Sequence, residues 1–144
     1  MLLCSGCVFE EESNNLIPDY NYTQIFVEKR LGEDRGDVEY KKIWDKEKIN
    51  KITDLLNPIP VESPGNQQTK KIESKLNEKG SYILSFLTQK DLDNRTTESV
   101  FYLALLQNGH IVYSNYNDHS EMRIRLVSVK KKPKLVKKII EMLY

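Results

Sequence analysis

Residues 100–114 read VFYLALLQNGHIVYS, which is two apolar runs joined by a polar turn. Asn108-Gly109 is the favoured pair for a two-residue type I′ turn, because both turn positions need a positive φ. The stretch therefore predicts an antiparallel β-hairpin, and a two-residue turn sets its register with Ala104 opposite Tyr113. Both faces of this hairpin are apolar. Helices can cover one face, and the other needs a cover of its own or is a place where something binds.

That register places two aromatic residues, Tyr102 and Tyr113, on either side of Ala104 on one face of the hairpin. The pattern predicts a shallow aromatic contact face. The alternative is that both tyrosines fill the interface between the sheet and its helices, because aromatic residues are ordinary strand formers.

The residues before the hairpin show strand and helix patterns in turn. Residues 23–29 and 37–44 read as two strands of a second hairpin. Asp45 is a good N-cap for a helix over 46–57, whose apolar side chains form one stripe: Ile49, Ile52, Leu55 and Leu56. The proline-rich residues 59–66 read as a loop, and a short helix is expected over 69–78.

The rest of the chain completes an α+β pattern. Residues 82–87 predict a strand, 89–97 a loop, 122–129 an edge strand and 133–143 a closing helix with Pro133 at its first position. In the edge strand we expect Met122, Ile124 and Leu126 on one face. Strand runs with helices at their ends predict a single domain: an antiparallel sheet of five to six strands with two to three helices packed mainly on one face.

The chain opens with MLLCSGC, in which the small residues Ser5 and Gly6 precede Cys7. Enzymes that attach diacylglycerol need such a thiol after small residues. A complete signal also has a positive start and an apolar stretch of about 7 to 15 residues, so we expect translation to start upstream or the signal to have been trimmed. Residues 8–21 are polar and acidic, which predicts a flexible tether over 1–21 and a domain over 22–144.

The lipobox-like start, the acidic tether, the Asp-capped helix, the Asn-Gly hairpin and the terminal helix resemble the small, mostly uncharacterised lipoproteins of Bacillus-like Gram-positive bacteria, including the YhfM-like group. Cys4 departs from the aliphatic residue that this family usually has three positions before its lipidated cysteine. The resemblance implies an extracytoplasmic, lipid-anchored location at the cell membrane and an accessory role. It implies no catalytic residue.

Two other uses of the cysteines remain open beside an incidental pair. Cys4 and Cys7 form a C-x-x-C, but a thioredoxin-like site needs a preceding strand for which there is no room. A zinc site could draw on His110 and His119, whose spacing does not match a His-x3-5-His arm. We therefore predict lipidation at Cys7, no metal site and no cofactor.

The composition limits the classes of partner that we expect for this chain. Lysine and arginine number 22 against 21 acidic residues, a net charge of +1, which argues against a nucleic-acid partner. No apolar run approaches the 18 or more residues of a membrane span, so membrane attachment is expected only through the lipid anchor.

One charge cluster stands out near the C-terminus. It is a possible contact patch for anionic headgroups or wall polymers, or simply the solvated face of an amphipathic helix. Its members are Lys130, Lys131, Lys132, Lys134, Lys137 and Lys138.

No motif for catalysis is recognisable, so we expect no enzyme. The leading hypothesis is a lipid-anchored accessory lipoprotein that binds an unknown partner protein or envelope component. The alternative is an inhibitor or immunity-type protein that binds and blocks an enzyme or toxin through its edge strand.

Overall fold

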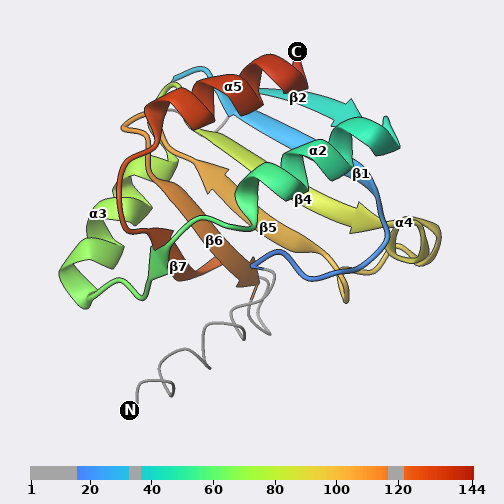
Figure 1. The fold of residues 1–144 in the computed structure, drawn as a ribbon, viewed down its shortest axis with the longest axis horizontal. Helices are drawn as coiled ribbons and strands as arrows, with labels where there is room; N and C mark the ends of the chain where they lie inside the picture. Colours follow the sequence, from blue (N-terminus) through green and yellow to red (C-terminus); the bar gives the residue numbers. More distant parts are fainter. Residues whose placement is uncertain (1–15, 33–36, 117–121) are drawn as a thin grey trace, which may run out of the picture.

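The computed structural model describes residues 16–32, 37–116 and 122–144, which form one antiparallel sheet and its helices (Figure 1). The seven strands lie in the order β2-β1-β4-β5-β6-β7-β3. They are β1 (Tyr22–Arg30), β2 (Val38–Ile43), β3 (Val61–Glu62), β4 (Tyr82–Thr88), β5 (Phe101–Leu105), β6 (Ile111–Tyr116) and β7 (Met122–Ser128). The helices are α2 (Lys46–Leu56), α3 (Asn66–Leu76), α4 (Gln89–Asn94) and α5 (Pro133–Leu143). The α+β prediction is confirmed, with one strand more than the five to six expected.

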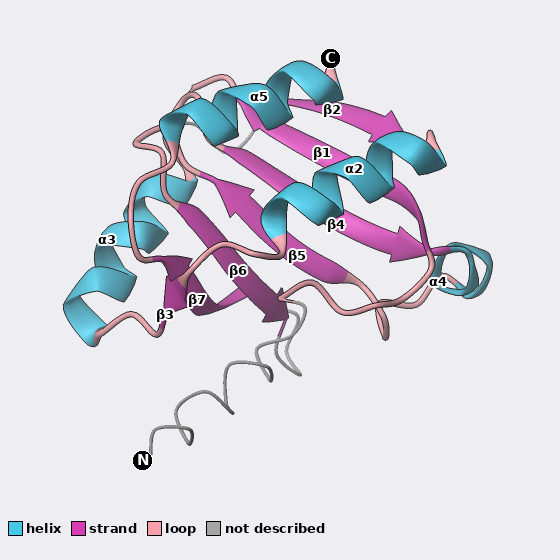
Figure 2. Ribbon diagram, in the orientation of Figure 1, coloured by secondary structure: helices cyan, strands magenta, loops and turns pink. Residues whose placement is uncertain are grey.

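The larger core lies between one face of the sheet and the helices α2 and α5, which cross in front of the strands in Figure 2. Both helices begin as the sequence predicts. The Asp45 side chain accepts hydrogen bonds from the backbone N–H groups of Glu47 and Lys48, and Pro133 occupies the first turn of α5. Most of the fully buried side chains of this core come from the helices and the central strands: Ile25, Val27, Ile49, Ile52, Leu56, Leu84, Phe86, Leu103, Leu105, Ile111, Ile139 and Leu143.

A smaller core lies on the opposite face, under α3. Ile72 of α3 is buried against Ile83, Ala104 and Val112 of the sheet, and Leu76 packs at the margin of the same cluster. The cover that the doubly apolar hairpin needed is therefore provided in part by the chain itself. Helices therefore lie on both faces of the sheet. The larger core, which α2 and α5 cover, agrees with the prediction that the helices pack mainly on one face.

Short-range patterns missed two elements and placed the start of a third one three residues too late. Residues 59–66 contain β3, which pairs with the end of β7, and residues 89–97 contain α4, whose N-cap Thr88 accepts from the N–H of Asp91. Helix α3 begins at Asn66 rather than Thr69, with Gly65 as its N-cap. These polar segments form regular structure because tertiary contacts add to their weak local preferences for helix or strand.

The central hairpin differs in register from the prediction by one residue. Of the two turn residues Asn108 and Gly109, only Gly109 has a positive φ (94°), so the pair does not form a type I′ turn. Instead Gly109 N–H donates to the Leu106 carbonyl, and Leu106 N–H donates to the His110 carbonyl, which is a three-residue loop. The extra loop residue moves Ala104 from Tyr113 to Val112. In a strand a shift of one residue turns each side chain to the other face.

A second irregularity changes β7. The ladder between β6 and β7 shifts between Tyr113 and Ser114, so that Ile124 pairs with Ser114 while Leu126 pairs with Tyr113. Ile124 packs with the smaller core and Leu126 with the larger one, so the prediction that they share a face is wrong. The bulge supplies the physical reason. β7 is also not the outermost strand, because β3 lies beyond it.

The packed domain includes part of the segment that we expected in the tether. Ile17 is fully buried in the larger core, and its N–H donates to the Asn57 side chain at 2.9 Å. The domain therefore begins before Tyr22. Within the part of the chain that the structure describes, no helix is long and apolar enough to cross a membrane.

Candidate binding groove

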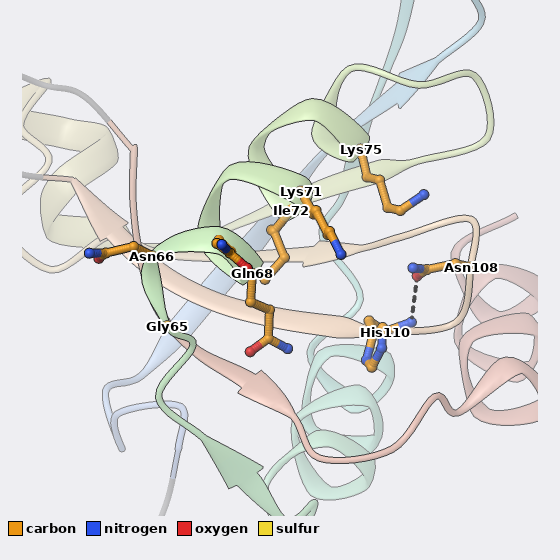
Figure 3. Close-up of a pocket in the computed structure, with 9 residues that line it drawn as sticks. Gly65, Asn66, Gln68, Lys71, Ile72, Lys75, Asn108 and His110 are labelled. Carbon is orange, nitrogen blue, oxygen red and sulfur yellow. Dashed lines mark hydrogen bonds between the residues drawn. The ribbon is translucent and has the colours of Figure 1, made fainter.

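A groove of about 690 Å³ separates α3 from the turn between β5 and β6 (Figure 3). The α3 wall is formed by the first turns of the helix and by two lysines, Lys71 and Lys75. The opposite wall is formed by Asn108 and His110. The groove exists because α3 packs on the sheet through a single buried residue, Ile72, and leaves its polar side chains at the rim.

The two lysines differ in how they are paired. Lys75 lies 3.9 Å from the carboxylate of Glu78, and both side chains are partly exposed, so this ion pair contributes little to stability. Lys71 forms no ion pair with any residue in the described part of the chain. In Figure 3 both lysines extend from α3 toward the β5–β6 turn. The groove thus carries positive charge on its helical wall, and no acidic residue is among its lining residues in the described ranges.

The strand side of the groove is built by hydrogen bonds around His110. Its backbone N–H donates to the side-chain oxygen of Asn108 at 3.0 Å, and its Nδ1 lies 3.3 Å from Ser128 Oγ. Ser128 Oγ also accepts from the N–H of Ile111 at 3.0 Å. These contacts fix the ring and the turn relative to β7. Because Ser128 is fully buried, its hydroxyl cannot act as a nucleophile on a bound substrate, despite the neighbouring imidazole.

Helix α3 opens onto the groove without a side-chain cap. Gly65 occupies the N-cap position with extended backbone and offers no side-chain acceptor. Gly65, Asn66 and Gln68 line this end of the groove, and the first N–H groups of the helix have no partner inside the helix.

The lysine patch expected near the C-terminus lies partly beside this groove. The N–H of Lys132 donates to the Gly109 carbonyl at 2.7 Å, so the segment before α5 runs along the β5–β6 turn. Lys130 and Lys131 belong to the same segment and are exposed. The remaining members, Lys134, Lys137 and Lys138, are exposed on α5, whose other side is buried in the larger core.

The two tyrosines proposed as an aromatic contact face do not share a face. Tyr102 pairs with Ser114 and Tyr113 with Leu103, which places the two rings on opposite sides of the sheet, and both are buried. The Tyr113 hydroxyl donates to the Leu56 carbonyl at 2.7 Å, and burial raises the pKa of Tyr113. The structure agrees with the alternative interpretation for Tyr113, which fills the interface between the sheet and its helices.

Several residues of interest lie outside the described residues, namely Cys4, Cys7 and His119. In the described ranges no group of three or more histidine, cysteine, aspartate or glutamate side chains is arranged to hold a metal ion. Asp91 accepts hydrogen bonds from the side chains of Thr88 and Thr96 and from the N–H of Ser99, so it organises the loop after α4.

Sequence reasoning did not find the groove. His110 lies more than thirty positions along the chain from Lys71 and Lys75, as their numbers show, and no local motif links it to them. The one available signal was the strong polarity of the α3 segment. This polarity predicted a weak helix, but it did not indicate which side chains of the helix would face the sheet and which the groove.

No known family model, no curated protein and no solved structure matches this chain.

Proposed function

We propose that this chain is an accessory lipoprotein, anchored through Cys7 on the extracytoplasmic side of the cell membrane, and that its domain binds a partner protein or an envelope component. The observation that carries the binding role is the groove beside α3. It is lined by polar and cationic side chains, and its histidine neighbours a buried serine rather than an accessible nucleophile. Such a surface suits recognition better than covalent chemistry.

The anchor is supported by the sequence around Cys7, since Ser5 and Gly6 supply the small residues that processing requires. A lipid anchor needs only one acylated residue, so the surface of the domain stays available for binding a partner. With Ile17 packed in the core, about nine residues separate Cys7 from the folded body, as their numbers show. That spacer would hold the domain close to the bilayer.

The experiment is membrane fractionation of the full open reading frame, with its upstream DNA, expressed in a Gram-positive host. We expect the wild-type protein in the membrane fraction and the Cys7→Ser variant in the soluble or secreted fraction. Cys4→Ser is the matched control and should fractionate like the wild type. A Cys7→Ser protein that remains in the membrane fraction would overturn the anchor.

A second candidate is an inhibitor or immunity-type protein that binds its target through an edge strand. The observation in its favour is β2, which is the outermost strand on one side of the sheet. It carries one exposed aromatic residue, Tyr40 (60% exposed), and is followed directly by another, Trp44 (56% exposed). An open strand edge can pair with a strand of another protein. In-frame stop codons upstream of Met1, with no apolar stretch, would favour this function over the lipoprotein.

A further inference from the structure

The groove beside α3 gathers donors of positive or partly positive charge on both of its walls. We propose that it binds a phosphate group carried by its ligand. This inference rests on the proposed function, because it names the chemistry of the component that the domain recognises.

The helical wall supplies the charge. Lys71 and Lys75 stand one turn apart on the same side of α3, and Figure 3 shows both side chains extended toward the β5–β6 turn. Lys71 has no ion-pair partner among the described residues, and Lys75 is held only by a long, exposed contact with Glu78. Neither lysine would therefore lose a strong interaction when an anion binds.

The strand wall supplies neutral donors in fixed positions. The side-chain oxygen of Asn108 is occupied by the His110 N–H, which leaves the Asn108 amide nitrogen as a donor toward the groove. Ser128 Oγ already accepts from Ile111, so its own proton can be donated to His110 Nδ1. In that arrangement the ring proton of a neutral His110 is on Nε2, which can donate to a ligand.

Gly65 provides no side-chain cap at the start of α3, where the positive end of the helix dipole lies. This end of the helix is roughly 13 Å along the axis from Lys75, at 1.5 Å per residue. It therefore adds a long-range attraction for an anion and no direct contact to a phosphate held by the two lysines.

The geometry favours phosphate over carboxylate. A phosphate group has oxygens that point in several directions and can accept from two walls at once. The groove residues offer lysines, which act as point charges, amides and an imidazole, whereas no arginine fork lines the groove among the described residues. A planar carboxylate would match only part of this set.

The test is a titration of the isotopically labelled full chain with inorganic phosphate and with glycerol 3-phosphate, followed by NMR. We expect saturable shifts of the amide signals of Gln68, Lys71 and His110. Charge reversal at Lys71 should weaken binding about tenfold, because it replaces an attraction at contact distance by a repulsion. Lys70→Glu is the matched control: Lys70 is also exposed on α3 but does not line the groove, so binding should change less than about twofold at ordinary salt. Lys71→Gln, which removes the charge without reversing it, should give an intermediate loss.

Equal weakening by Lys70→Glu and Lys71→Glu would overturn the proposal, because binding would then follow net charge alone. Absence of saturable shifts with either phosphate compound would overturn it as well.

Vesicles of phosphatidylcholine with and without phosphatidylglycerol identify the source of the phosphate. Binding to the anionic vesicles that Lys71→Glu abolishes and Lys70→Glu retains would assign a lipid headgroup. Binding of glycerol 3-phosphate without vesicle binding would assign a soluble ester. Fractionation of Cys7→Ser does not depend on the groove, so failure of phosphate binding and failure of the anchor are separate results.

Discussion

Helices α2 and α3 have the same length of eleven residues and lie on opposite faces of one sheet, yet they are built differently. α2 is capped by Asp45 and buries three side chains, namely Ile49, Ile52 and Leu56. α3 starts at an uncapped Gly65 and buries only Ile72. α2 therefore belongs to the stable body of the domain, while α3 leaves most of its surface, and the groove beside it, available for a ligand. The following substitutions test that division.

The largest effect is expected at Ile52, the fully buried residue in the middle of α2. Ile52→Ala should lower the free energy of unfolding by about 4 kcal/mol, because it removes buried methyl groups and leaves a cavity among well-packed neighbours. Urea denaturation followed by circular dichroism measures this change. A loss below about 1 kcal/mol would mean that α2 is not part of the main cooperative unit.

The matched change in α3 is Ile72→Ala, with an expected loss of about 2 kcal/mol. The cost is smaller because Ile72 borders the groove, so water can reach part of the space that the side chain leaves. Amide hydrogen exchange should accelerate across α3 and stay slow in α2. If both helices lost protection equally, α3 would be as integral to the fold as α2.

Removing the cap of α2 should have a smaller effect. Asp45→Ala leaves the N–H groups of Glu47 and Lys48 without their acceptor and should cost about 1 kcal/mol. Asp45→Asn is the control, because an amide oxygen can still accept, and it should retain most of the stability. The melting curves of the two variants and the wild type provide the measurement.

The smallest effect is the reverse experiment on α3. Gly65 has extended backbone and open space where a Cβ would lie, so a serine can cap α3 without strain. Gly65→Ser should raise the free energy of unfolding by about 0.3 kcal/mol. Gly65→Asp should give a similar or larger gain and should also weaken phosphate binding, because its carboxylate lies at the mouth of the groove. Equal phosphate affinity in the two variants would show that the ligand does not approach this end of α3.

How far the sequence could predict the structure depends on the range of the interactions involved. α5 was predicted at its observed bounds, because Pro133 and the apolar stripe are local signals. α4 and β3 were missed, because α4 depends on a cap and a loop organised by Asp91, and β3 depends on pairing with a strand more than sixty positions away. The candidate groove joins walls from α3 and from the β5–β6 turn, which no local pattern connects.

By itself, the sequence determined the α+β class, the positions of the main strands and helices, the N-cap of α2 and the proline that begins α5. These depend on side-chain periodicity and on backbone preferences within a few residues. The tertiary structure decided the register of the central hairpin, the bulge that separates Ile124 from Leu126, and the face on which α3 lies. These choices set which side chains meet, and they follow from packing and hydrogen bonds between distant segments. The Asn-Gly turn illustrates the reason: one extra residue in the loop costs little locally, but it exchanges the two faces of a strand.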